Sequence, residues 1–136
     1  MDPSIDAEAK LTFEGRLRLL RESNQATEAV VAFVREEMAQ IAGELGLSLD
    51  TDGAGMLVNH LVLALERARN GTPYVAPAEI VQLLAAELDG RPAIRHRARR
   101  LATRARQRLH ADLPDSEVDF LAVHLAAILT AGQLDG

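Results

Sequence analysis

Two of the four histidines lie in apolar, helix-forming segments, where a side chain with a purely structural role would more often be leucine. His60 lies in LVNHLVLALERARNG and His124 lies in DSEVDFLAVHLAAIL. The ordinary pKa of an imidazole is about 6.5, so the ring can act as a metal ligand, a general acid or base, or a nucleophile. His96 and His110 lie in or beside an arginine-rich segment, and we expect them at the surface.

Charged residues accompany both histidines at helical spacing. Arg67 follows His60 by two turns, a rise of roughly 10 Å, and Glu117 precedes His124 by the same interval. Each charge also has a simpler explanation, because an acid near a helix start and a base near a helix end both favour the helix dipole.

The sequence contains few motifs that would assign one of these chemical roles to the histidines. A metal site needs further ligands, for which Glu66 and Glu117 are candidates, but no HxxxH or HExxH pattern occurs. The chain has no cysteine, GxSxG motif or phosphate-binding glycine loop. We therefore expect no metal, no cofactor and no enzymatic activity. The remaining role is that of a phosphoryl acceptor, because an imidazole nitrogen is a good nucleophile and its phosphoryl adduct transfers readily.

Composition predicts an all-α fold of one domain. The 136 residues are 48% hydrophobic but only 3% aromatic, so a core must consist mainly of aliphatic side chains and alanine. Alanine and leucine favour helices, whereas the residues typical of strands are scarce.

The spacing of apolar residues predicts five helices. Gly46 is a natural helix stop, Asp50, Thr51 and Asp52 compete as N-cap of the second helix, and Asp115 is the expected N-cap of the last. We expect a five-helix bundle within a single domain over 24–136, and residues 1–23 as an N-terminal arm or short extra helix. The predicted helices cover about 24–45, 56–70, 77–88, 92–109 and 117–130.

Arginine is concentrated in residues 91–110, which hold eight arginines and no acid. The formal net charge is −5, so the rest of the chain, with seven basic and twenty acidic residues, carries −13. This basic helix could pair with acidic helices of its own bundle, dock an acidic partner protein, or bind nucleic acid. Acidic surroundings and the lack of aromatic stacking groups argue against direct nucleic-acid binding. The acidic pair Glu36 and Glu37 is expected on a solvated face.

Targeting signals are absent from the sequence. The N-terminus, MDPSIDAEAK, is acidic and has no apolar core of a signal peptide. No apolar run approaches the roughly 20 residues of a membrane span. A cytoplasmic protein without membrane association is expected.

Two octapeptides resemble the paired motifs of the PTS regulation domain, or PRD. The first runs from His60 through Leu-Val-Leu-Ala-Leu-Glu to Arg67 and is followed by Gly71. The second runs from Glu117 through Val-Asp-Phe-Leu-Ala-Val to His124, so the histidines are 64 residues apart. Leu63 stands where many members have an aromatic residue. The resemblance covers residues 24–131.

The resemblance implies a bacterial regulatory domain related to sugar antiterminators and transcriptional regulators. It implies that His60 and His124 are phosphorylated by HPr or by a sugar-specific B component (EIIB) of the phosphotransferase system. Arg67 and Glu117 would support the site, and phosphorylation would control homodimer packing. Members usually carry two copies and an effector domain, whereas this sequence has one copy and no room for an effector. Output through a separate effector protein is therefore expected.

Overall fold

The computed structural model describes residues 12–135 of the chain, and the side chains of residues 12–130. This part of the chain is helical throughout, as predicted. It contains six helices rather than five, because residues near the N-terminus add one. The helices are α2 (Phe13–Glu22), α3 (Glu28–Leu45), α4 (Asp52–Arg69), α5 (Ala78–Glu87), α6 (Pro92–Leu109) and α7 (Asp115–Asp135).

The additional helix, α2, belongs to the packed core. Thr12 caps its start by accepting a hydrogen bond from the Gly15 amide at 3.0 Å. Phe13, Leu17 and Leu20 are buried on one face, as expected for an amphipathic helix that packs on its neighbours. Residues 1–11 of the expected N-terminal arm lie outside the described residues.

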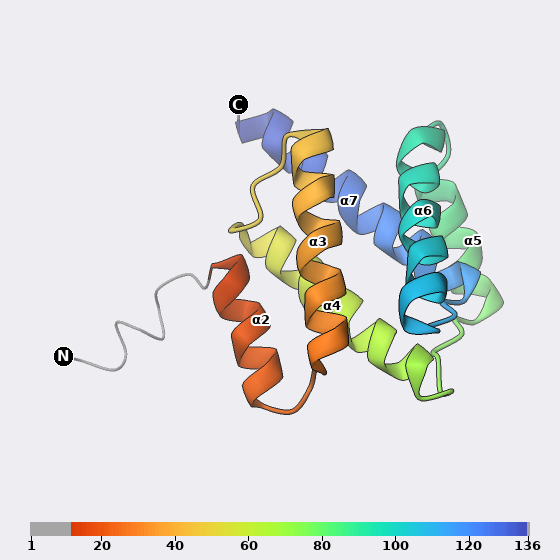
Figure 1. Cartoon of the computed structure of the whole chain (residues 1–136). Helices are drawn as coiled ribbons and strands as arrows, with labels where there is room; N and C mark the ends of the chain where they lie inside the picture. Colours follow the sequence, from red (N-terminus) through yellow and green to blue (C-terminus); the bar gives the residue numbers. More distant parts are fainter. Residues whose placement is uncertain (1–11, 136) are drawn as a thin grey trace.

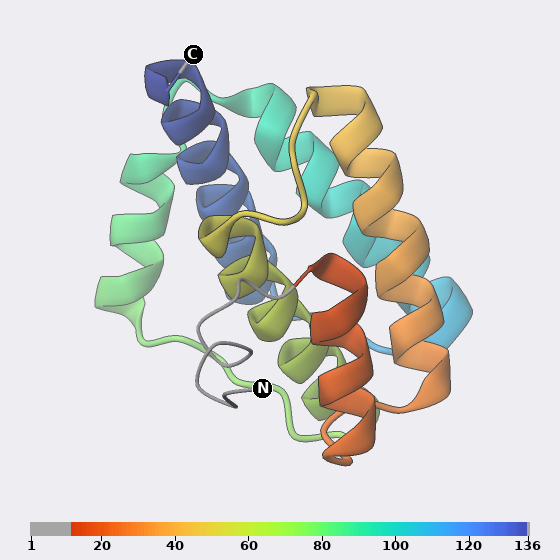
Figure 2. The same ribbon diagram turned by 90° about the vertical axis from the view of Figure 1, so that its left-hand side faces the viewer.

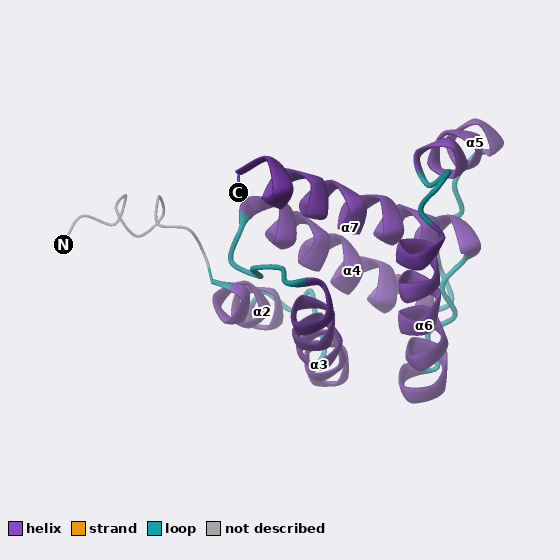
Figure 3. Cartoon of the chain, turned by 90° about the horizontal axis from the view of Figure 1, so that it is seen from above, coloured by secondary structure: helices purple, strands orange, loops and turns teal. Residues whose placement is uncertain are grey.

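Helices α4 and α7 lie side by side across the middle of the molecule (Figures 1 and 3). Helices α2 and α3 pack on one flank of this pair, and α6 and α5 lie on the other. Helix α5 packs mainly against α7 at the edge of the molecule, as Figure 2 shows. The central pair carries both candidate histidines, so its packing decides whether they meet.

The core is aliphatic, as the composition predicted. The largest fully buried side chains come from α2, α3, α4 and α7 and include one aromatic ring: Phe33, Leu17, Met38, Ile41, Leu57, Leu61, Leu65, Leu121, Leu125, Val30, Val31 and Val34. Such side chains stabilise the bundle by roughly 1.5–3 kcal/mol each when they leave water. None of the described helices is long and apolar enough to cross a membrane.

Several predicted helix ends are correct and others move by a few residues. Gly46 ends α3 with a φ of 68°, in the left-handed region that glycine adopts without strain. Thr51 is the N-cap of α4, so α4 begins before the predicted start at 56. Gly55, in the predicted loop, lies inside this helix against the side chain of Arg16. Its missing Cβ therefore permits the close approach of α2.

The start of α7 differs from prediction, and α5 is only narrowly covered. Asp115 is the first residue of α7, and the carbonyl of Pro114 accepts the amides of Glu117 and Val118. Helix α5 buries Leu84 and, at its end, Leu88, whereas its apolar residues Ile80 and Leu83 are exposed. This helix packs mainly on one neighbour, so only a narrow stripe of it is covered.

Candidate phosphoryl acceptor site

His60 lies in the middle of α4, on the side that faces α7. Its side chain is 24% exposed, and its Nε2 atom is buried without a hydrogen-bond partner among the described residues. Apolar positions on both sides of it, Leu57 and Leu61, belong to the core. The amphipathic pattern of α4 therefore holds one ring nitrogen away from solvent and leaves part of the ring accessible.

His124 lies on α7, and its ring meets that of His60. The two imidazole centroids are 5.7 Å apart, with ring planes inclined by 30°. Phe120, one turn earlier on α7, has its ring centroid 4.7 Å from that of His60 and 5.1 Å from that of His124. The three rings form one cluster, which we call the ring cluster.

Glu117 lies one turn before Phe120 on α7 and reaches the same cluster. Its side chain is 4% exposed, and its Oε2 atom is 3.5 Å from Nε2 of His60. The Nη2 atom of Arg67 lies 4.0 Å from the same oxygen, and the Arg67 side chain is 45% exposed. The two helices thus bring together all four residues that the sequence singled out.

The environment of the ring cluster favours an uncharged His124. Burial, followed by the nearby charge of His60, lowers the pKa of His124 below its ordinary value of 6.5. Both causes act against the protonated ring. At neutral pH this ring therefore keeps a nitrogen lone pair, which a nucleophile requires.

Phe120 is the residue of the site whose role the sequence alone does not reveal. It is only partly buried, and its ring lies beside both imidazoles, which also contact each other. Its spacing of four residues from His124 places both rings on one face of α7. That spacing indicates that Phe120 belongs to the site only when α4 is known to pack on this face of α7.

Metal binding has no support from the described residues. No group of three or more histidines or acids in that part of the chain is arranged to hold an ion. Glu66, the other acid considered as a ligand, instead contacts Arg69 at 4.0 Å and accepts the amide of Thr27.

The arginine-rich helix, α6, is partly neutralised within the bundle. Arg104 donates two hydrogen bonds to Glu37, at 2.6 and 2.7 Å, and this contact raises the arginine pKa. Arg97 is almost fully buried and donates to Glu44 at 2.8 Å. Further pairs join Arg95 to Asp119, Arg100 to Glu44 and Arg108 to Glu36. Pairing of this helix with acids of its own bundle is thereby confirmed.

The expectation that Glu37 is solvated is wrong. Its side chain is 3% exposed because α6 packs on this part of α3 and brings Arg97 and Arg104 to it. The adjacent Glu36 remains on the exposed side of the helix. His96 and His110 are exposed, as predicted.

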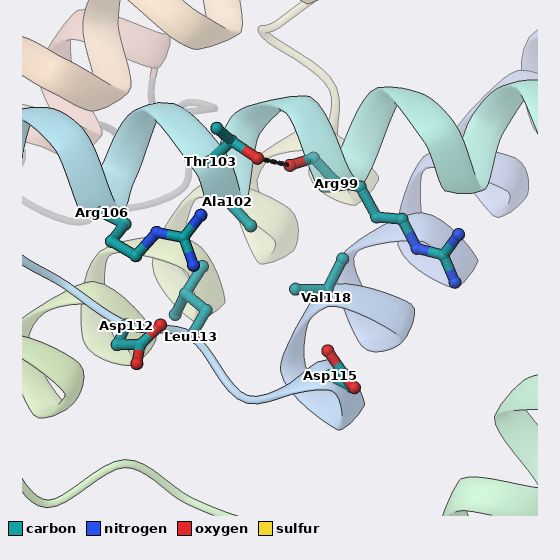
Figure 4. Close-up of a pocket in the computed structure, with 8 residues that line it drawn as sticks. All are labelled: Arg99, Ala102, Thr103, Arg106, Asp112, Leu113, Asp115 and Val118. Atoms are coloured by element: carbon teal, nitrogen blue, oxygen red, sulfur yellow. Dashed lines mark hydrogen bonds between the residues drawn. The ribbon is translucent and has the colours of Figure 1, made fainter.

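Two unpaired arginines of α6 border a polar pocket of about 280 Å³ beneath the helix (Figure 4). Arg99 and Arg106 line it from α6, and Asp112 and Asp115 line it from the following loop and the start of α7. None of the four forms an ion pair within the described residues. Neither histidine of the ring cluster lines this pocket. The negative charges of Asp112 and Asp115 oppose the binding of a polyanion in the pocket.

The sequence of residues 35–128 matches the model of the PRD domain. This chain belongs to the PRD domain family. The match covers more than half of the chain and includes the whole ring cluster, Glu117 and Arg67, whereas α2 lies before it. PRD membership indicates, in general terms, a regulatory domain that interacts with components of the phosphotransferase system. No curated protein and no solved structure matches the chain.

Proposed function

We propose that this PRD domain is a phosphorylation-dependent regulatory module whose acceptors are His60 and His124. The phosphoryl donor in this proposal is HPr or a sugar-specific B component, and the domain is a receiver of the group rather than an enzyme. The proposal depends chiefly on one observation, the assembly of both imidazoles, Phe120 and the buried carboxylate of Glu117 between α4 and α7.

The acceptor role fits the surroundings of the rings. A lowered pKa of His124 keeps that ring unprotonated at neutral pH. Both side chains are only partly buried, so a donor protein can approach them. Arg67 lies at the rim of the site, where its guanidinium can contact a phosphoryl oxygen.

Phosphorylation would disturb this site strongly enough to act as a switch. A phosphoryl group adds a charge of about −1.5 to −2, here close to the buried carboxylate of Glu117. Two unit charges about 7 Å apart, roughly the separation expected across the imidazole ring, repel by about 2 kcal/mol at an effective dielectric constant of 20, and the phosphoryl group carries up to two. Inverting a two-state population from 1:99 to 99:1 needs about 5.5 kcal/mol. One phosphoryl group thus supplies a large part of that energy.

The regulatory output in this proposal is a change of association. Rearrangement of Glu117 and Arg67 around the new charge would alter the surface formed by α4 and α7. Such a change would shift the balance between a single chain, a homodimer and a complex with a separate effector protein that controls transcription.

The test is phosphoryl transfer followed by intact-mass measurement. The chain is incubated with phosphoenolpyruvate, Enzyme I and HPr, with and without a sugar-specific B component. We expect an acid-labile adduct of phosphoryl mass that is reduced in H60A or H124A and lost in H60A/H124A. The matched control is H96A/H110A, which removes the two exposed histidines outside the cluster and should leave the adduct intact. A wild-type chain that stays unmodified with every donor contradicts the proposal.

The alternative, nucleic-acid or partner-protein binding through α6, has less support. Five of the eight arginines of residues 91–110 are paired with acids of the same chain. Paired arginines release fewer counterions from a nucleic acid, which weakens binding. A gel-shift titration at two salt concentrations tests this reading, and tight, strongly salt-dependent binding would favour it.

A further inference from the structure

The two ring nitrogens of His60 lie in different environments. Nε2 is buried and has no hydrogen-bond partner among the described residues. Because 24% of the side chain is nevertheless exposed, the accessible part of His60 lies away from Nε2. The ring of Phe120 stacks on one face of the imidazole, with planes inclined by 19°, and limits its rotation.

Nε2 of His60 and Oε2 of Glu117 are natural partners. They lie 3.5 Å apart, and Oε2 is also buried without a hydrogen bond in the described part of the chain. Leaving a buried donor or acceptor unpaired is unfavourable, and more so for a charged group. A small rotation of either side chain closes the contact into an N–H···O hydrogen bond, so this pairing is favoured.

The pairing selects a tautomer of the ring. An ionised carboxylate only accepts hydrogen bonds, so the Nε2 atom that faces it must carry the proton. In a neutral imidazole the other nitrogen, Nδ1, then holds the lone pair. The nitrogen that can attack phosphorus is therefore the one that does not face Glu117.

We propose that Nδ1 of His60 accepts the phosphoryl group and that Glu117 is a positioning residue that holds the Nε2 proton. This inference rests on the proposed function and adds the identity of the reacting atom. Among the described residues, Nε2 of His60 is the one histidine nitrogen that lies within 4.0 Å of a carboxylate oxygen, so the selection applies to His60 alone.

The transfer step balances without an additional reactant. The Nδ1 lone pair forms a bond to phosphorus while the bond between phosphorus and the donor's histidine nitrogen breaks, and that electron pair returns to the donor ring. With the donor ring protonated on its second nitrogen, the donor leaves as a neutral imidazole. His60 becomes a phosphorylated ring with a cationic Nε2–H group, and the carboxylate of Glu117 stabilises this cation.

The test determines which isomer of phosphohistidine forms. His60 is isolated as the acceptor of the cluster in H124A, with ¹⁵N-labelled histidine, and is phosphorylated by phosphoenolpyruvate, Enzyme I and HPr. A parallel reaction uses phosphoramidate, which needs no protein donor. Nitrogen and phosphorus NMR then distinguish the Nδ1 isomer from the Nε2 isomer. The same reaction on the urea-unfolded chain gives the preference of an unconstrained ring.

We expect the Nδ1 isomer in folded H124A. Glu117→Gln should lower the ratio of Nδ1 to Nε2 isomer by about tenfold or more, because a hydrogen bond to a charged group is lost. Glu117→Asp should restore part of the preference. The matched control is Asp115→Asn, an exposed acid in the same first turn of α7, which should leave the ratio unchanged.

The possible failures are distinguishable. A predominant Nε2 isomer in H124A, a ratio that Glu117→Gln does not change, or an adduct that forms in the wild type but not in H124A overturns this inference alone. Absence of phosphohistidine in the wild type with both the protein donors and phosphoramidate overturns the proposed function as well.

Discussion

At the scale of single residues, the partly buried imidazoles differ in their charged neighbours. His60 faces the carboxylate of Glu117, whereas His124 faces Phe120 and the other imidazole. The two rings are therefore chemically distinct although their sequence contexts are alike. Substitution of His60 and substitution of His124 should therefore affect different properties of the domain.

His124 should make the stability of the domain depend on pH. Its pKa is lowered in the folded state, by burial and then by the charge of His60, so the unfolded chain binds this proton more readily. The free energy of unfolding should therefore be fully retained above the ordinary pKa of 6.5 and fall as the pH drops from there towards the folded pKa.

This dependence is measured by urea unfolding at pH values from about 5 to 8. With His124→Gln, the free energy of unfolding should decrease less as the pH falls below the ordinary pKa. His96→Gln, at an exposed position of α6, should leave it unchanged. Equal slopes for the wild type and His124→Gln would show that this ring does not contribute to the decrease.

At the scale of the elements, α2 and the contact between α3 and α6 are the features that sequence patterns described least well. Helix α2 lies before the residues matched by the PRD domain, yet it contributes to the same core as α3 and α4. The contact between α3 and α6 depends on buried ion pairs rather than on apolar side chains alone.

The contribution of α2 can be measured with two leucines on opposite faces. Leu17 is completely buried, and Leu17→Ala should lower the free energy of unfolding by about 2–5 kcal/mol through lost burial and a cavity. Leu19 is 53% exposed, and Leu19→Ala should change the free energy of unfolding by less than about 1 kcal/mol. Chemical denaturation measures both, and equal effects would mean that α2 does not belong to the core.

The ion pairs between α3 and α6 can be measured with two adjacent acids. Glu37→Ala leaves the partly buried Arg104 without a partner and leaves the buried Arg97 only its contact with Glu44, and should lower the free energy of unfolding by up to about 3–5 kcal/mol. Glu36→Ala removes only an exposed pair with Arg108 and should change it by at most about 1 kcal/mol. A small effect of Glu37→Ala would show that Arg97 and Arg104 find water or other partners.

At the scale of the whole molecule, the ring cluster lies between the two central helices. A charge added there acts on the packing of α4 against α7. Helix α4 also packs on α2 and α3, and α7 also packs on α5 and α6, so the pair contacts every other described helix. Local chemistry at the cluster can therefore change the surface that the domain offers to a partner.

Phosphorylation should change self-association measurably. We expect the dissociation constant of a homodimer to shift by at least about tenfold, which corresponds to 1.4 kcal/mol, between the unmodified and phosphorylated chain. Sedimentation velocity over a range of concentrations measures this shift. H60A/H124A, treated with the same donors, should show none. An unchanged distribution for fully phosphorylated wild type would remove self-association as the output and leave a separate partner.

Local sequence patterns predicted the helical fold, most helix positions and the four candidate residues His60, Arg67, Glu117 and His124. Helical periodicity and the spacing of histidine, arginine and glutamate are local properties, and they can be read without knowing how helices pack. The end of α3 at Gly46 was predictable for the same reason, because a left-handed residue is a local requirement.

Which of these residues meet, and which are buried, depends on how the helices pack. The 5.7 Å separation of the imidazoles, the contact of Phe120 with the His60 ring and the burial of Glu37 all depend on packing between different helices. Glu36 and Glu37 are chemically identical neighbours, and one is buried only because α6 crosses α3 at that point. Helical periodicity assigns residues to faces, but the neighbour that covers a face is set by contacts distant in sequence.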